Sequence, residues 1–441
     1  MSKLEVNNAL AEERRLKKLQ NQERARQEDE ARSRILPRKW IDLSQSQPPL
    51  KENRRCKVMT WNLLAQCLVR RTLFPTSDCL KASEREHMLY REILEHKADI
   101  CCLQEVDRTE KVFPVLDKAG YGHVHVAGPL KKHGCTIAFR REILDRYAEK
   151  RILYDEQEIR QTGKGDLAKR GISFRTKNVA NLVALKWKDC EDDGVIVATT
   201  HLFWHPSYTY ERARQAAILL REVTRFRHGL GKESWPCIIA GDFNFAPDDP
   251  AYSILVGDPL LPQQSSRLSA SRVVHVTIDP EVPVTTKKMM ADDEGDGDGE
   301  TDPDRIIVNA RRAGDDDGLL TDEELREICV SAGQPFSAYD RGLQRAEAIN
   351  PALLFGSRVS IPQGRRGAAE PIWTSYTHFW KVVLDYIFVV DPDRNADVVG
   401  VASPHPTENL KPGLPRKGVC ASDHISLCAD LTWSNNSSSV V

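Results

Sequence analysis

The sequence contains no long apolar run. Its hydrophobic stretches fall short of the roughly 20 residues that a membrane-spanning helix needs. The first residues, MSKLEVNNALAEERRLKK, include no apolar segment of the signal-peptide kind. We therefore expect neither a membrane anchor nor a secretory signal. We expect an intracellular protein that resides in the nucleus, the nucleolus or the cytoplasm.

Cysteine patterns that bind zinc or build disulfide frameworks are also absent. The eleven cysteines are an odd number, most lie inside apolar segments, and no CxxC…CxxC or CxxC…HxxxH arrangement occurs. This distribution is typical of a reducing compartment.

Neither sign of charge is in excess, because 63 Lys and Arg residues face 64 Asp and Glu residues. The balance neither favours nor excludes a nucleic-acid partner, so the distribution of charge matters more. Residues 1–50 form a charged N-terminal arm, which we expect to be helical or disordered. Residues 51–434 are predicted to form one domain, and residues 435–441 a disordered tail. No repeat or heptad seam is present, so we expect a monomer.

One acidic segment interrupts the predicted domain. Residues 291–304, ADDEGDGDGETDPD, carry eight acidic residues and three glycines but no large apolar residue. We predict a disordered surface insertion at about 286–318. The adjoining DDDGLLTDEEL resembles part of a calcium loop, but Ala313 would take the first ligand position. A helix start capped by Thr321, with Glu324 three residues later, explains these residues better.

The apolar runs of the domain are short and outnumber the segments with helical spacing. Runs such as KVMTWNLLA, DICCLQEV, GVIVATTHLF and CIIAGDFN are predicted strands, whereas EREHMLYREILEHKA and TYERARQAAILLREVTRFRH have helical spacing. Many strands follow one another directly in sequence. This order favours an α/β sandwich of two stacked mixed sheets with helices outside, rather than a doubly wound parallel sheet.

Polar side chains follow the buried run Cys237–Ala240 at once. Gly241 lets the backbone turn where a Cβ would clash. Asp242 and Asn244 are two residues apart, so in an extended chain they face the same way. An Asx turn explains Asp242 and Asn244 equally well. The residues at the other strand ends are needed to distinguish a structural turn from a functional site.

Five further apolar runs carry the same kind of interruption. The polar residues are Asn62, Glu105, His201, Asp385 and the neighbouring pair Asp423 and His424. Each alone is consistent with a capped turn, a buried ion pair or a satisfied core histidine. All of these residues are acids, amides or imidazoles, and unpaired buried charges are costly. A purely structural role for every one of them is therefore disfavoured.

These residue types define a specific chemistry. Carboxylates and amides without clustered cysteine or histidine favour a hard cation, Mg²⁺ or Mn²⁺, as one ion or two. A histidine beside a buried aspartate is an oriented, more basic imidazole. Phosphodiester hydrolysis needs such parts: a cation, a positioned water and donors for developing negative charge.

The motifs TWNLLAQ, LQEV, THLFWHP, GDFN, LDYIF and SDH, in this order over residues 58–431, resemble the endonuclease/exonuclease/phosphatase superfamily. NLLAQ, THLFWHP and LDYIF are similar to the branch that contains nocturnin, Angel and the carbon-catabolite-repressor deadenylases. LAQCLVRRTLFP and THLFWHPSYTYERARQ look closest to the fungal NGL exonucleases. The resemblance implies a four-layer α/β sandwich of two mostly antiparallel sheets flanked by helices.

The resemblance also implies roles for the motif residues. Glu105 looks like the principal metal ligand, Asp423 a further ligand, and Asn62 a support for the ion or a phosphate oxygen. Asp242 and Asn244 would position the attacking water and a scissile oxygen, and His201 would donate to the phosphate. His424 would be a base-like imidazole oriented by Asp385. The substrate-binding residues implied are Asn178, Pro206 and Trp380; the last two correspond to a pair that brackets the terminal base.

The implied activity is a Mg²⁺-dependent 3′→5′ exoribonuclease that releases nucleoside 5′-monophosphates. One fungal NGL exonuclease is implicated in trimming 5.8S rRNA, which makes pre-rRNA a candidate substrate. His205 stands where deadenylases usually carry an acidic residue, and leucine-rich repeats are lacking. Both departures favour structured RNA over poly(A). A poly(A) deadenylase, another phosphoesterase of the superfamily and a catalytically silent RNA-binding protein remain as alternatives.

Overall fold

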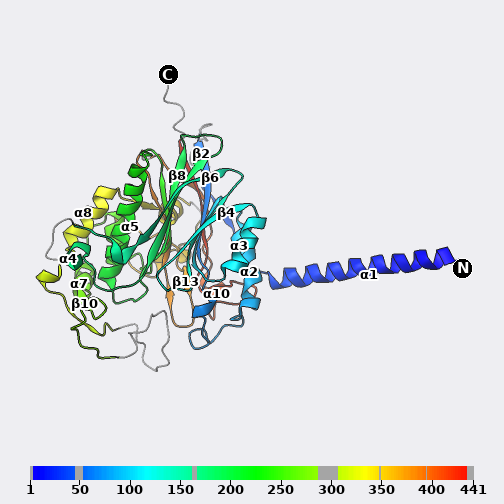
Figure 1. The fold of residues 1–441 in the computed structure, drawn as a ribbon, viewed down its shortest axis with the longest axis horizontal. Coiled ribbons are helices and arrows are strands. Elements are labelled where there is room, and N and C mark those ends of the chain that lie inside the picture. The colour runs from blue at the N-terminus through cyan, green and yellow to red at the C-terminus, as the bar shows by residue number, and fades with distance from the viewer. Residues whose placement is uncertain are drawn as a thin grey trace, which may run out of the picture.

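The two predicted sheets stack face to face, with helices on both outer surfaces, in the computed structural model (Figure 1). The structure describes residues 3–44, 53–160, 166–286, 306–346, 349–393 and 395–434. The predicted four-layer α/β sandwich is therefore confirmed. Within these ranges, no helix is long and apolar enough to cross a membrane.

The first sheet has seven strands, and one parallel pair lies within it. Its order is β1 (Trp40–Asp42), β16 (Asp397–Ala402), β17 (Leu427–Ser434), β2 (Asn53–Asn62), β3 (Ile100–Val106), β5 (Gly134–Arg140) and β4 (Tyr121–Ala127). Strands β2 and β3 are parallel, and the other neighbours are antiparallel. Helix α2 (Ala82–Glu95) connects the parallel pair, as a parallel crossover requires.

The second sheet has six strands and repeats this arrangement. Its order is β12 (Phe336–Ser337), β15 (Asp385–Val390), β9 (Cys237–Asp242), β8 (Gly194–His201), β7 (Val179–Trp187) and β6 (Leu144–Leu153). Strands β8 and β9 are parallel and are connected by α5 (Thr209–Gly229). The remaining described elements are α3 (Thr109–Lys118), α4 (Asp166–Arg170), α6 (Pro250–Val256), α7 (Pro262–Ala270), α8 (Asp322–Ala332), α9 (Ala338–Gln344), α10 (Thr407–Leu410), β10 (Val273–His275), β11 (Ala310–Arg312), β13 (Ser375–Tyr376), β14 (Lys381–Val382) and short 3₁₀ turns.

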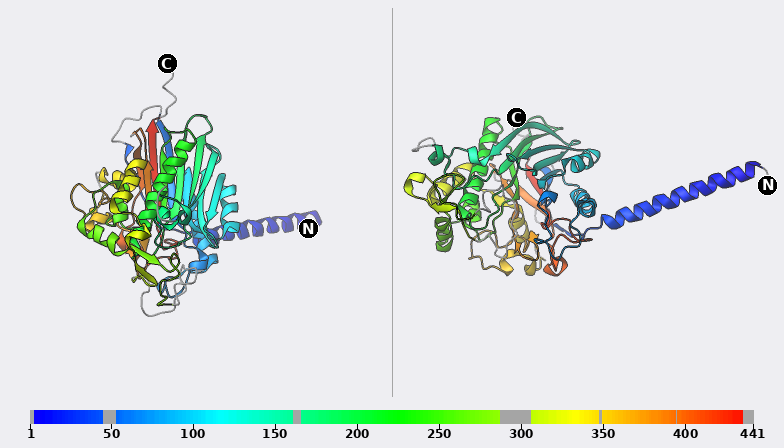
Figure 2. Two further views of the ribbon diagram at one scale, coloured as in Figure 1. Left: turned by 60° about the vertical axis from the view of Figure 1, so that its left-hand side comes forward. Right: turned by 60° about the horizontal axis from the view of Figure 1, so that its bottom comes forward.

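The strands are apolar on both faces because each sheet is covered on both sides. In β2, Val58 points into the core between the sheets, whereas its neighbour Met59 packs on the outer side with Met88 of α2. In β9, Ile238 faces the other sheet and Ile239 faces the α5 side. This alternation has the period of two that an extended chain imposes. Figure 2 shows α5 covering the second sheet.

The N-terminal arm is a helix that projects away from the sandwich. Helix α1 spans Lys3–Arg32 and extends outward (Figure 1). The domain begins before residue 51, where we had placed its boundary, because β1 pairs with β16 through Ile41 and Val401. A three-residue edge strand gives little sequence signal, which is why composition alone misplaced this boundary. The expected tail, 435–441, lies outside the described residues.

Part of the predicted disordered insertion at about 286–318 is ordered. Residues 287–305 lie outside the described part, but residues 306–318, which we expected to be disordered, contain β11 and a 3₁₀ turn at Asp315–Asp317. β11 pairs with β10, and Arg311 forms ion pairs with Asp279 and Asp317. The capping box at α8 is confirmed: Thr321 Oγ1 accepts from Glu324 N, and Glu324 Oε2 accepts from Thr321 N.

Candidate active site

The two parallel strand pairs bring four of the predicted residues to one place. Asn62 and Glu105 lie at the carboxyl ends of β2 and β3, and His201 and Asp242 end β8 and β9. Asn62 Nδ2 donates to Glu105 Oε1 (2.7 Å) and to Asp242 Oδ2 (2.9 Å). One buried amide thus holds together a carboxylate from each sheet.

Asn62 is oriented by its own chain. Its Oδ1 accepts from Leu64 N at 2.9 Å, so the donor end faces the carboxylates. In this arrangement Asn62 positions Glu105 and Asp242, and its carbonyl oxygen serves the local turn. Our assignment of Asn62 to the metal shell stays a prediction.

Glu105 adopts a backbone conformation that side chains other than glycine rarely take. Its φ is 54°, and the pairing of β3 with β5 shifts register between Leu103 and Val106. Glu105 Oε2 also accepts from Ala65 N at 2.8 Å. Strain of this kind costs about 1–3 kcal/mol and persists where surrounding contacts enforce it. The irregularity therefore aims the Glu105 carboxylate into the cluster.

The GDFN segment combines both interpretations of its sequence. Asn244 N donates to Asp242 Oδ1 (3.0 Å) in an Asx turn, with Asn244 at φ 52°. Asp242 Oδ2 meanwhile faces Asn62. The predicted turn at Gly241 is wrong, because β9 continues through Gly241 to Asp242. A Cβ at Gly241 would lie 2.2 Å from Thr200 O, so glycine permits close approach of β8.

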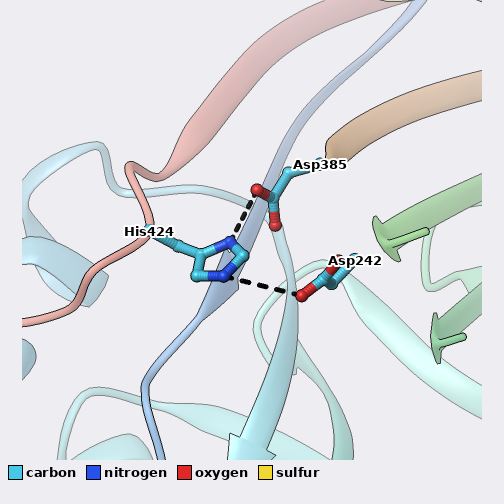
Figure 3. A group of neighbouring side chains, drawn as sticks. All are labelled: Asp242, Asp385 and His424. Carbon is cyan, nitrogen blue, oxygen red and sulfur yellow. Dashed lines mark hydrogen bonds and ion pairs between the residues drawn. The ribbon is translucent and has the colours of Figure 1, made fainter. Parts of the chain in front are cut away.

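His424 lies between two aspartates (Figure 3). Its Nδ1 is 2.8 Å from Asp385 Oδ2, and its Nε2 is 3.7 Å from Asp242 Oδ2 and 3.9 Å from Asp423 Oδ2. The register of β15 places Asp385 directly opposite Asp242. Asp385 therefore fixes the imidazole so that Nε2 points into the cluster.

The same three residues, Asp242, Asp385 and His424, are close enough to form a metal-binding group among the described residues. The 2.8 Å contact between Asp385 and His424 is a hydrogen-bond distance, however, and uses both atoms. The geometry therefore favours an Asp–His pair. It leaves Glu105, Asp242 and Asp423 as the carboxylates available to a hard cation.

Burial and neighbouring charges shift the ionisation of this pair. Burial raises the pKa of Asp242 to about 8, while the His424 charge opposes the shift. Burial alone would lower the pKa of His424, but the carboxylates of Asp385, Asp242 and Asp423 raise it well above the usual value. The neighbouring carboxylates thus favour the protonated form of His424. The base-like role of His424 stays a prediction.

His201 lies on the other side of the cluster. Its Nε2 is 3.5 Å from Asp242 Oδ2, and its Nδ1 is 3.9 Å from Glu105 Oε1. Asn178 Nδ2 donates to the backbone oxygen of His201 at 2.7 Å. Both residues therefore join the cluster, and both line a pocket beside Glu105.

The two residues of the predicted base-binding pair, Pro206 and Trp380, differ in their surroundings. Pro206 is exposed, whereas Trp380 is half-buried, packs edge-on against Phe74 and donates from Nε1 to Ser375 Oγ. His205 is buried, and its backbone oxygen accepts a hydrogen bond from the Arg212 side chain. His205 therefore takes part in the loop structure. Pro206 and Trp380 remain predicted substrate contacts.

The sequence analysis missed Arg85, a buried arginine that supports the cluster from α2. Arg85 donates to the oxygens of Leu63 and Leu64 after β2, and to Ala421 O (2.6 Å) before Asp423. It therefore connects the loop that follows Asn62 with the loop that carries Asp423. Arg85 shares the buried side of α2 with Met88, so a charge at an apolar position of the helical pattern was the available signal.

Known proteins share the sequence pattern of this chain. The model of the Endonuclease/Exonuclease/phosphatase family matches residues 59–424, and the chain belongs to that family. It is 29% identical over 439 residues to the RNA exonuclease NGL2 of Saccharomyces cerevisiae, covering 90% of this chain and 81% of that protein. The probable RNA exonuclease NGL3 of the same yeast is 27% identical over 404 residues, covering 85% of this chain and 76% of that protein. The resemblance inferred from the motifs is thus confirmed.

Solved structures share the fold. ANGEL2, described as a 2′,3′-cyclic phosphatase, aligns with a TM-score of 0.57 and 19% identity, covering 90% of this chain and 98% of that one. The human nocturnin catalytic domain with a bound sulfate anion gives 0.53 and 19%, with the same coverage. At this identity the likeness describes architecture, and activity must be argued from the site.

Proposed function

We propose that the protein is a metal-dependent 3′→5′ exoribonuclease that hydrolyses RNA phosphodiesters to nucleoside 5′-monophosphates. The observation that carries the proposal is the meeting of Glu105, Asp242 and the His424–Asp385 pair at the carboxyl ends of two parallel strand pairs. The names of the yeast relatives, both RNA exonucleases, support RNA as the substrate.

The side chains have complementary roles in this proposal. Glu105 and Asp423 would hold Mg²⁺ or Mn²⁺, which when bound neutralises charge on the phosphate oxygens. Asp242, whose pKa burial raises to about 8, accepts a proton from the attacking water, and Asn244 shapes the turn that orients it. His424 holds a proton at Nε2 and donates toward the phosphate, oriented by Asp385.

His201 donates to the phosphate from the opposite side, and Asn178 fixes the backbone beside it. Such fixed donors stabilise developing negative charge without reorganisation. Pro206 and Trp380 would bracket the terminal base. Because stacking tolerates every base, this contact orders the RNA end without specifying adenine.

We place the activity in the maturation of rRNA 3′ ends, such as that of 5.8S rRNA, with poly(A) shortening as the second candidate. The histidine at position 205, where deadenylases usually carry an acidic residue, favours the first. Sequencing of RNA 3′ ends after depletion of the protein distinguishes rRNA maturation from poly(A) shortening. Extended 5.8S ends support rRNA processing, whereas lengthened poly(A) tails reverse the order.

The activity itself is tested with 5′-labelled single-stranded RNA in Mg²⁺ buffer and in EDTA. We expect a ladder that shortens from the 3′ end, mononucleotide 5′-phosphate products and no turnover in EDTA. Abasic duplex DNA and inositol polyphosphates serve as competing substrates. If RNA stays intact while either of these is hydrolysed, the protein is a different phosphoesterase.

A further inference from the structure

A solvent-open pocket lies next to the catalytic cluster and shares Glu105 and His201 with it. Its other walls come from two loops. The β4–β5 loop contributes Lys131 and His133, and the segment that enters β7 contributes Lys177 and Asn178. The pocket thus places two lysines beside the acidic cluster.

The two loops are locked together by their backbones. Lys177 has a left-handed backbone, with φ 58°, that Asp155 enforces by accepting from Lys177 N (2.9 Å) and Thr176 N (3.2 Å). A Cβ on Gly128 of the opposite loop would lie 2.1 Å from Lys177 O. The strain at Lys177 and the close approach at Gly128 therefore fix the position from which each lysine reaches the pocket.

The charge and polarity of the pocket fit a sugar phosphate. The cluster itself repels a polyanion through Glu105, Asp242, Asp385 and Asp423, and nearby lysines offset that repulsion. Asn178 is 6% exposed, and its Oδ1 has no hydrogen-bond partner among the residues that the structure describes. A buried acceptor of this kind requires a donor, which a ribose hydroxyl beside a bound phosphate supplies.

We propose that this pocket binds a second phosphate of the substrate, one nucleotide away from the scissile linkage, through Lys131 and Lys177. The proposal rests on the proposed RNA hydrolysis. A phosphate left at the 3′ terminus of RNA has the same chemistry, so the test separates an internal phosphodiester from a terminal phosphate monoester. Neither lysine belongs to the hydrolytic cluster, so their loss affects substrate binding rather than the chemical step.

The test compares three oligonucleotides in steady-state hydrolysis: unmodified RNA, RNA with a neutral methylphosphonate at the linkage next to the scissile one, and RNA with a 3′-phosphate. The variants are Lys131→Gln and Lys177→Gln. Lys132→Gln is the matched control, because Lys132 lies in the same loop, is exposed and is not part of the pocket wall. Each variant removes one positive charge.

With wild-type protein, we expect the methylphosphonate to raise KM by about 10- to 100-fold, the range of a lost charge-assisted contact. Each pocket variant raises KM for unmodified RNA similarly but loses most of the methylphosphonate effect, and kcat changes little. If the pocket instead takes a terminal phosphate, the 3′-phosphate lowers KM for the wild type and not for the variants. Either pattern supports a phosphate subsite.

Equal effects of Lys132→Gln and the pocket variants would overturn the proposal, since they would reflect overall charge. So would additive effects of the lysine changes and the methylphosphonate. Binding of the same oligonucleotides to Asp242→Asn protein measures the subsite without turnover. Absence of RNA hydrolysis by the wild type, with this binding pattern intact, would count against the proposed function alone.

Discussion

Replacing Asp385 with asparagine tests the catalytic role of the His424–Asp385 pair. Asp385 is fully buried, and its Oδ2 lies 2.8 Å from His424 Nδ1. A hydrogen bond to a charged group contributes about 1.5–3 kcal/mol and a neutral one about 0.5–1.5 kcal/mol. The difference of about 1–2 kcal/mol predicts that kcat falls by about 5- to 30-fold. A larger fall follows if the new amide turns its NH₂ toward Nδ1.

The pH profile gives this prediction a sign. The Asp385 carboxylate is the first of the neighbouring charges that raise the pKa of His424 against the effect of burial. A neutral amide lowers that pKa, so the protonated imidazole is lost at lower pH. The alkaline limb of kcat against pH therefore moves to lower pH in Asp385→Asn, measured with saturating RNA and Mg²⁺.

Asp430→Asn is the matched control, because Asp430 is also a buried aspartate but accepts from Arg55. It can lower stability but leaves the pH profile unchanged. A folded Asp385→Asn protein with kcat within 3-fold of the wild type and the same alkaline limb would refute the reasoning. Thermal unfolding of both variants checks that they are folded.

Three further predictions follow from the site. Glu105→Gln lowers kcat by about 10²–10³-fold and raises the Mg²⁺ concentration for half-maximal rate; an unchanged Mg²⁺ titration would remove Glu105 from the metal shell. Gly241→Ala destabilises the fold by about 1–3 kcal/mol in urea unfolding, because the new Cβ meets Thr200 O; wild-type stability would contradict the close approach. Trp380→Ala weakens RNA binding by about 1–3 kcal/mol whatever the terminal base, measured by KM, whereas exposed Phe379→Ala has a smaller effect; the reverse order would assign stacking to Phe379.

The sequence predicted the fold, and it pointed to the polar residues of the candidate site, because both leave local signals. Short strands with few intervening helices indicate stacked sheets. A carboxylate such as Asp242 at the end of a buried strand stands out against its apolar neighbours, since burial without function is costly. The Thr321–Glu324 capping box was equally readable, because its three-residue spacing lies within one helical turn.

Other features depend on strand register and on contacts between distant segments. Asp385 lies opposite Asp242 through the pairing of β15 with β9, and Gly241 owes its identity to Thr200 on β8. The order of residues along the chain does not encode such distances. The raised pKa of His424 likewise depends on carboxylates from distant segments, Asp385 and Asp242.

The sequence alone therefore determined which chemical groups the protein has and that they lie at or next to the ends of strands. The tertiary structure decided how these groups lie relative to one another. It placed Asn62 between Glu105 and Asp242, gave Glu105 its strained backbone, brought Arg85 beneath two loops and joined Lys131 to Lys177 in one pocket. The physical reason is that charge interactions and hydrogen bonds act over a few ångströms in space, whatever the separation in sequence.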